Sequence, residues 1–303
     1  MQPDITQGVI RRGAMRTATA FATAALLVLT GAIGAKATDE VDSLALVESH
    51  GLLRAEAGPP VTTNGSNDGS ARSSAFSVST DDLLPLTPVD DGAVTQVAHL
   101  KASVIEEASY GIVTGIGASG TSASFIVLKD EAAPRAFDFV VGDGTLTLET
   151  ARDGGVLVQN ASGEIVNFLL PPWAKDANGA DLHTWYTIDG DVVTQHIDTA
   201  GAEHPIVADP TTGCGLGWCS IYFNRNKTKQ ISAGGAVAAT AITGACALAG
   251  PVGAAACGLA TGAIVATAQA ANSTNECVGL VGYSVAGIYN SWNPFIHGDE
   301  HCT

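Results

Sequence analysis

The sequence predicts an α+β protein in several parts, in which an antiparallel β-sandwich is followed by a disulfide-stapled helical hairpin. Three observations predict this class. Short β-rich runs separated by turn residues recur between residues 96 and 211, which is the pattern of an antiparallel sandwich. A stretch of 41 residues, 231–271, then contains no charged side chain. All six cysteines lie after residue 212, within this stretch and on both sides of it.

Residues 1–37 have the three-part pattern of a secretory signal peptide. Arg11, Arg12 and Arg16 precede an uncharged run over residues 17–35, which ends at the small-residue site Ala-Lys-Ala over 35–37. A basic end, an apolar middle and an A-x-A site in this order predict export and removal of the segment. A retained membrane anchor is the alternative, which the short, Ala- and Thr-rich run disfavours. We therefore expect a secreted, extracellular or cell-surface protein.

The charge balance excludes one class of partner. The chain has 14 Lys and Arg against 30 Asp and Glu, a net charge of −16. Removal of residues 1–37 takes away 4 basic residues and 1 acidic residue, which leaves 10 against 29, a net charge of −19. Binding to nucleic acid requires the opposite sign, because phosphates must be neutralised. We therefore expect no nucleic-acid partner.

Residues 38–95 have the composition of an acidic disordered linker or propeptide. Turn-forming residues dominate 58–70, and the acidic pairs Asp81-Asp82 and Asp90-Asp91 follow. Low hydrophobicity combined with such residues is typical of disorder. A short helix is expected within 41–54.

Residues 96–211 predict a β-sandwich carrier domain. Turn dipeptides such as Asp143-Gly144 and Asp189-Gly190 separate the apolar runs, and they supply the positive φ that hairpin tips require. Such Asp-Gly turns also occur in calcium sites, but we expect no metal here. The expected strands include 124–128, 137–141, 146–148, 156–158, 164–168 and 191–195.

Two motifs in this domain carry a family resemblance. Pro171-Pro172-Trp173 is followed by Asp-Ala-Asn-Gly over 176–179, and His-Pro-Ile-Val-Ala-Asp-Pro-Thr occupies 204–211. Residues 125–211 thereby resemble a β-rich module of exported actinobacterial proteins, as found in Rhs-like and wall-associated proteins. The resemblance implies a presentation module ahead of a variable C-terminal segment, and it carries over no catalytic residue. Trp173 and Trp185 are expected to serve packing rather than ligand binding.

The cysteines predict a disulfide-stapled unit over residues 212–303. An even number of cysteines in an exported segment indicates disulfides, and six allow 15 connectivities. Sequential pairing is the simplest choice. A metal site formed by Cys214, Cys219 and the His297–Cys302 segment is the alternative, disfavoured because export is oxidising. We expect neither metal nor cofactor. The cysteines are Cys214, Cys219, Cys246, Cys257, Cys277 and Cys302.

The uncharged stretch predicts two helices, 230–249 and 252–271, folded back at Gly250-Pro251. Of its residues, 17 are Ala, 7 are Gly and 8 are Val, Ile or Leu. Each helix would measure about 30 Å at 1.5 Å per residue, which matches the hydrocarbon core of a bilayer. Small residues would allow close helix contact and self-assembly. The expected membrane-hairpin residues are Ile231, Val237, Ile242, Leu248, Gly250, Pro251, Gly258, Gly262, Ile264 and Val265.

The same hairpin is alternatively a core element. Eight Val, Ile and Leu residues contribute only about −2 to −5 kcal/mol toward membrane insertion, which Gly, Pro and Thr can cancel. A helix that is apolar all round requires a cover of protein or lipid. Seven residues that flank the stretch, six of them aromatic, can supply such a cover. They are Tyr222, Phe223, Tyr283, Ile288, Tyr289, Trp292 and Phe295.

The predicted function follows from these features. The segment from Cys214 onward resembles C-terminal regions of uncharacterised exported actinobacterial proteins, and its composition is similar to that of Gly/Ala-rich pore-forming bacteriocins of the colicin V type. This implies a secreted, non-enzymatic, membrane-active protein whose hairpin inserts into the lipid of a target membrane. The alternative is an extracellular or cell-surface structural or binding protein with the hairpin as core. A hydrolase would require a reactive Ser or Cys near His297 or His301, because the other histidines lack a nucleophile motif.

Overall fold

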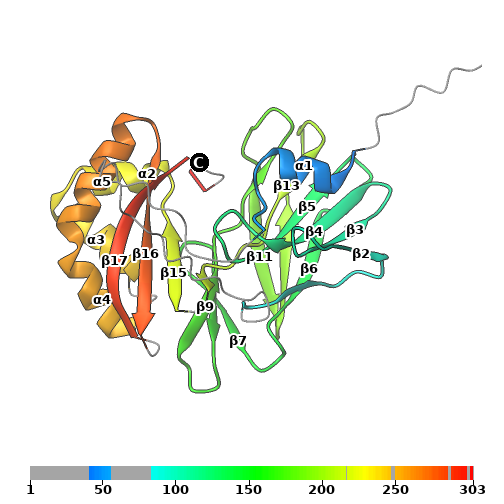
Figure 1. Ribbon diagram of the computed structural model, residues 1–303. Helices are drawn as coiled ribbons and strands as arrows, with labels where there is room; N and C mark the ends of the chain where they lie inside the picture. The colour runs from blue at the N-terminus through cyan, green and yellow to red at the C-terminus, as the bar shows by residue number, and fades with distance from the viewer. Residues whose placement is uncertain are drawn as a thin grey trace, which may run out of the picture. The chain divides into compact units, whose positions relative to one another are not determined.

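The computed structural model describes residues 41–55, 83–215, 217–246, 250–285, 288–298 and 301–302 (Figure 1). The predicted signal peptide, residues 56–82 of the predicted linker, and Leu248 lie outside these ranges. The described residues from Val41 onward belong to one compact unit.

Antiparallel sheets make up the part before residue 212. One sheet has the strand order β1-β6-β12-β11, a second β10-β13-β5-β4-β3-β2, and a third β7-β8-β9. The strands are β1 Leu86–Pro88, β2 Val94–Val97, β3 Ala102–Glu106, β4 Tyr110–Ile116, β5 Ser122–Leu128, β6 Ala136–Val141, β7 Thr147–Thr150, β8 Val156–Gln159, β9 Ile165–Leu169, β10 Ala174–Lys175, β11 Thr184–Asp189, β12 Val192–Ile197 and β13 Ile206–Ala208. The predicted antiparallel β-rich character of this part is confirmed, and all six named runs overlap strands.

The four-stranded and six-stranded sheets share a hydrophobic core. Ile126 and Leu128 of β5 belong to one buried cluster with Phe137 and Phe139 of β6. Alternation along β6 places these two aromatic residues on the inner face, while Ala136 and Asp138 are exposed. This period of two is what a strand with one buried face requires.

The structure differs from the disordered-linker prediction at both ends of the range 38–95. Helix α1 spans Ser43–Ser49 inside the expected window, and its N-cap Asp42 accepts a hydrogen bond from the Ala45 amide at 3.0 Å. Val47 is fully buried against the β-sheet core, and β1 pairs with β6. Long-range burial of a few apolar residues orders these segments, which composition alone does not reveal.

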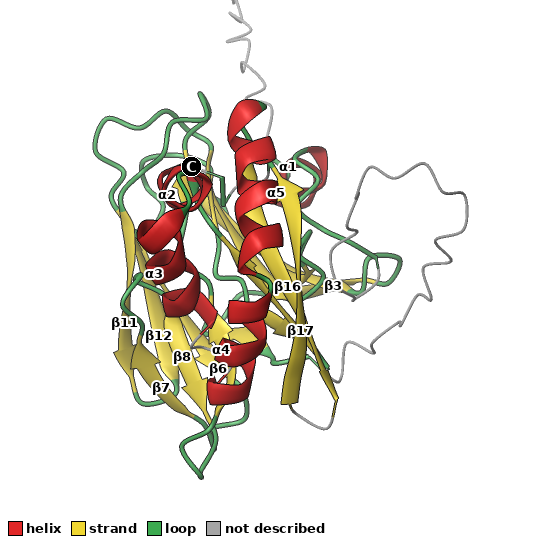
Figure 2. Cartoon of the chain, turned by 90° about the vertical axis from the view of Figure 1, so that its left-hand side faces the viewer, coloured by secondary structure: helices red, strands yellow, loops and turns green. Residues whose placement is uncertain are grey.

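The C-terminal part combines a sheet with a layer of helices. Its sheet has the order β14-β15-β16-β17, and α5 lies against β16 and β17, with α4 against β17 (Figure 2). Its elements are β14 Cys214–Gly215, β15 Trp218–Tyr222, α2 Arg225–Ser232, α3 Gly235–Cys246, α4 Gly250–Leu259, α5 Thr261–Ser273, β16 Cys277–Val285 and β17 Ile288–His297. We call α2–α5 the helical layer.

The helical layer corrects the prediction of two long helices. Each expected helix is divided, the first between α2 and α3 and the second at Ala260 between α4 and α5. Gly234 and Gly235 have φ values of +71° and +65°, in the left-handed region that ends a helix at low cost only for glycine. Gly250 and Pro251 begin α4 instead of forming the turn. Proline is tolerated there, because the first turn of a helix needs no amide donor.

Three disulfides join the cysteines in sequential order, as the simplest pairing predicted. Cys214 pairs with Cys219, Cys246 with Cys257, and Cys277 with Cys302, at Cα–Cα distances of 4.0, 6.0 and 5.5 Å. The second disulfide connects the end of α3 to α4, and both of its cysteines are fully buried. No cysteine is free. Disulfides of this kind fit an oxidising compartment.

The central disulfide gives a stability prediction. Replacing Cys246 and Cys257 together by alanine removes a disulfide that links two residues 11 positions apart in the sequence. Loss of this crosslink should lower the free energy of unfolding by about 3 kcal/mol. Denaturant unfolding of the purified chain measures the change. The matched control replaces Cys214 and Cys219, which close only a 5-residue separation and should cost less. An unchanged unfolding free energy in the Cys246/Cys257 variant would contradict this role.

Candidate functional site

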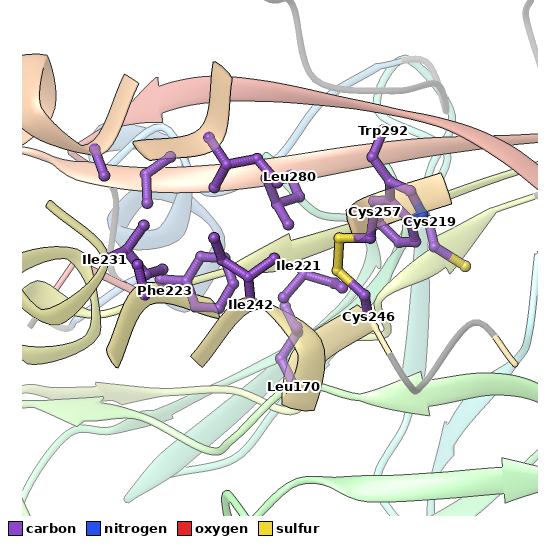
Figure 3. Packing of buried hydrophobic residues seen from close by; sticks show 14 of the residues in the cluster. Leu170, Cys219, Ile221, Phe223, Ile231, Ile242, Cys246, Cys257, Leu280 and Trp292 are labelled. Carbon is purple, nitrogen blue, oxygen red and sulfur yellow. A yellow bond between two sulfur atoms is a disulfide. The ribbon is translucent and has the colours of Figure 1, made fainter. Parts of the chain in front are cut away.

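The inner face of the helical layer is a buried core. Ile231 of α2, Ile242 of α3 and Ile264 of α5 are at most 1% exposed. They belong to one cluster with Phe223, Leu280 and Trp292. In Figure 3, Ile242 lies between Ile231 and the Cys246–Cys257 disulfide, which is at one side of the cluster near Trp292. Within a helix the buried positions recur at intervals of three or four, as Ala238, Ile242 and Cys246 do in α3.

The expected aromatic cover is present only in part: Phe223 and Trp292 lie in this cluster and Tyr222 packs against it, whereas Phe295 belongs to another cluster and Tyr283 is 37% exposed. The side chains of Ile288 and Tyr289 lie outside the described part.

Helices α3–α5 have an exposed outer face without charged residues, whereas α2 carries the exposed Arg225, Lys227 and Lys229. Val237 of α3 is 56% exposed and Leu259 at the end of α4 is 92% exposed. Gly244, Gly258 and Gly262 face open space, since a Cβ atom built on any of them would meet nothing within 4 Å. The sequence places no charged side chain anywhere in 231–271. The outer face of α3–α5 thus carries mainly small and apolar residues, together with the exposed polar residues Thr240, Thr243 and Gln269.

Seven of the ten predicted hairpin residues have a described burial, and these seven are divided between the two faces. Ile231, Ile242 and Ile264 are core, whereas Val237, Gly258 and Gly262 are exposed and Val265 is half-buried. Gly250 and Pro251 lie in the first turn of α4. The expected small-residue seam at Gly258 and Gly262 makes no close contact among the described residues. In the described parts of the chain, no helix has both the length and the hydropathy needed to cross a bilayer.

The charges of the C-terminal part differ from those of the rest. Residues 212–303 contain three basic residues, Arg225, Lys227 and Lys229, and three acidic residues, so their net charge is zero. The net charge of −16 therefore comes from the preceding residues. The three basic residues all lie in α2, where Lys227 and Lys229 are exposed. This places cationic groups at one end of the uncharged face.

The histidines near the C-terminus pack against aromatic rings. The ring of Tyr222 lies 5.0 Å from that of His297 and 4.9 Å from that of His301. His297 is 8% exposed. All six cysteines are oxidised, so no thiol is available beside these rings as a nucleophile or ligand. Within the described ranges, no group of three or more His, Cys, Asp and Glu residues is placed to hold a metal ion.

The two motifs of the family resemblance meet in space. Ala174, next to Trp173, pairs with Ala208 in the β10–β13 ladder. The buried Asp209 carboxylate accepts a hydrogen bond from the Trp173 amide at 3.3 Å and another from the Thr211 hydroxyl. Burial, together with the charge of Asp209, raises the pKa of Tyr186 well above its ordinary value. Trp173 is 7% exposed, so its predicted packing role is confirmed.

The two tryptophans of the β-rich part differ in exposure. Trp185 of β11 is 41% exposed, and its ring lies 4.8 Å from that of His183 and 5.1 Å from that of His196. The sequence did not distinguish it from Trp173, because its exposure depends on which side of β11 faces the core. The only local signal is alternation, since Tyr186 beside it is buried.

The division of the helical layer into two faces gives a second prediction. Ile242→Ala should lower the free energy of unfolding by about 2–4 kcal/mol, because it opens a cavity in the core. Val237→Ala on the same helix should change it by less than about 0.5 kcal/mol, since the side chain is largely exposed. Denaturant unfolding of both variants provides the comparison. Equal losses would show that α3 has no preferred buried face.

Comparison of the chain with family models, with curated proteins and with solved structures gave no match.

Proposed function

We propose that the chain is a secreted, non-enzymatic, bacteriocin-like protein that acts on target membranes through the outer face of its helical layer. The observation that carries this proposal is the exposure of that face, where Val237 and Leu259 are 56% and 92% exposed. A wide exposed surface without charge is unusual on an acidic protein. Surfaces of this kind serve contact with a partner or a membrane.

Electrostatics favours approach of this face to lipid. Of the 30 acidic residues, which anionic headgroups would repel, 27 lie before residue 212, and the C-terminal part is neutral overall. Lys227 and Lys229 of α2 are exposed and can contact lipid phosphates, which attract basic residues over short distances. In this arrangement the β-sandwich carrier keeps the protein in solution while the helical layer makes contact.

The lengths of the helices imply that binding at the membrane surface precedes insertion. The longest helices of the layer have 12 and 13 residues, or about 20 Å at 1.5 Å per residue, against a hydrocarbon core of about 30 Å. The folded layer therefore first lies at the interface. Full insertion requires α2 to merge with α3, and α4 with α5, with the Cys246–Cys257 disulfide holding the two arms together. Self-oligomers would then form through Gly258 and Gly262, whose outward position suits close helix contact.

One observation favours the second candidate, an extracellular structural or binding protein. The inner face of the layer is already packed, with Ile231 and Ile264 fully buried. In this case the helices are a permanent core, and their outer face never meets lipid. The two candidates differ in whether the folded chain binds vesicles.

Vesicle binding tests the proposal. The full chain without residues 1–37 is floated with phosphatidylcholine vesicles and assayed for dye leakage. Leu259→Asp places a charge on the outer face without disturbing the core, and it should reduce vesicle binding by at least about tenfold, because a charged side chain strongly disfavours lipid contact. Val166→Asp is the matched control, since Val166 is an exposed apolar residue of β9, and it should bind as the parent does.

The second candidate gives a different pattern. If the parent chain neither floats with vesicles nor releases dye, the membrane proposal is wrong. Equal binding by the parent chain and Leu259→Asp would also contradict it.

A further inference from the structure

The outer side of the β1-β6-β12-β11 sheet carries an aromatic and polar surface. Trp185 pairs in register with His196 of β12, and His196 pairs with Ala136 of β6. The next row on the same side contains Thr187, Thr194 and Asp138. Residues two apart along a strand share a face. These two rows therefore form one continuous surface, which we call the Trp185 surface.

The aromatic row is held in position before any ligand arrives. Trp185 stacks on His196 with an interplanar angle of 12°, and His183 approaches its ring at 35°. The Thr187 hydroxyl and the Nε2 atom of His196 are 2.8 Å apart, within hydrogen-bond distance. Rings fixed in this way lose little conformational freedom on binding. An indole that remains 41% exposed offers apolar surface together with an N–H donor.

The polar row supplies hydrogen-bonding groups next to the aromatic row. The Thr194 hydroxyl donates to Asp138 Oδ1 at 2.6 Å, which orients the carboxylate. An ionised carboxylate has about four acceptor positions, so it can also accept hydrogen bonds from ligand hydroxyls. The distance from Trp185 to Asp138 is two strand spacings across and one two-residue step along the sheet, or roughly 12 Å. The surface is thus wider than a single small molecule.

The acidic residues of the Trp185 surface limit the class of ligand that it can bind. The charged residues of β6, β11 and β12 on this side are Asp138 and Asp189, and both are acidic. Polymers bearing phosphate, sulfate or carboxylate groups would be repelled, whereas a neutral ligand rich in hydroxyl groups would not. The apolar C–H face of a sugar ring complements an indole, and its hydroxyls complement a carboxylate. We infer that the Trp185 surface binds a neutral polysaccharide, with one pyranose ring against the exposed part of Trp185 and another ring farther along the same glycan chain hydrogen-bonded to Asp138.

This inference is independent of the proposed membrane activity, because it concerns another part of the chain. A protein with both surfaces would attach to a glycan coat through the β-rich part and present the helical layer. If the chain does not bind vesicles, the polysaccharide inference still stands. If it does not bind polysaccharide, the membrane proposal still stands.

Retention on insoluble polysaccharides tests the inference. The full chain without residues 1–37 is incubated with insoluble cellulose and with chitin, and the bound fraction is measured. The parent should bind at least one of them, and Trp185→Ala should reduce the affinity by at least about tenfold, as loss of a central aromatic contact does. Val166→Ala, an exposed change on β9, is the matched control and should bind as the parent does.

A second variant covers the case in which Trp185→Ala does not fold. Asp138→Asn keeps the size of the side chain and removes its charge, and it should reduce the affinity about threefold, because charge-assisted hydrogen bonds are the stronger ones. Absence of binding to both polysaccharides would overturn the inference. So would unchanged binding by Asp138→Asn, or by a folded Trp185→Ala. Equal retention on anionic alginate would overturn the assignment of a neutral ligand.

Discussion

The constraint on which the C-terminal part depends is the burial of one side of an uncharged, alanine-rich helical layer. Ile231, Ile242 and Ile264 provide the few large side chains that point inward, and they pack against Leu280 and Trp292 of the sheet. Alanine contributes little burial per residue, so these large residues carry most of the hydrophobic stabilisation. The Cys246–Cys257 disulfide holds α3 to α4 where the packing surface is small. Because the layer has few large side chains and these point inward, the outer side of α3–α5 carries mainly small, uncharged residues.

The β-rich part and the C-terminal part are also joined by specific contacts. The Asn167 side chain donates to the Cys214 carbonyl and accepts from the Cys214 amide, each at 3.0 Å. Phe168 and Leu170 belong to the same buried cluster as the inner face of the helical layer. Cleavage near residue 211 would therefore not by itself free the C-terminal segment, because separation would expose these two side chains.

Local patterns in the sequence were sufficient for part of this structure. Turn residues and apolar runs located strands such as β6 and β12, and the order of the cysteines matched their pairing. The number of helices was predicted wrongly, because the break between α2 and α3 depends on positive φ values at Gly234 and Gly235, which the residue types permit but do not require. The ordered ends of the expected linker depend on distant partners, since Val47 packs in the β-sheet core and β1 pairs with β6. The Trp185 surface depends on strand register, which brings Trp185 beside His196.

The central claim is that the helical layer is already folded in water, with one side buried and the other exposed. Methyl NMR of the full chain without residues 1–37, recorded without lipid and with a soluble paramagnetic agent, tests it most directly. The account predicts strong broadening of the Val237 and Leu259 methyl signals and little change for Ile231, Ile242 and Ile264. Similar broadening of all five residues would contradict the account, because it would show a layer with no protected side.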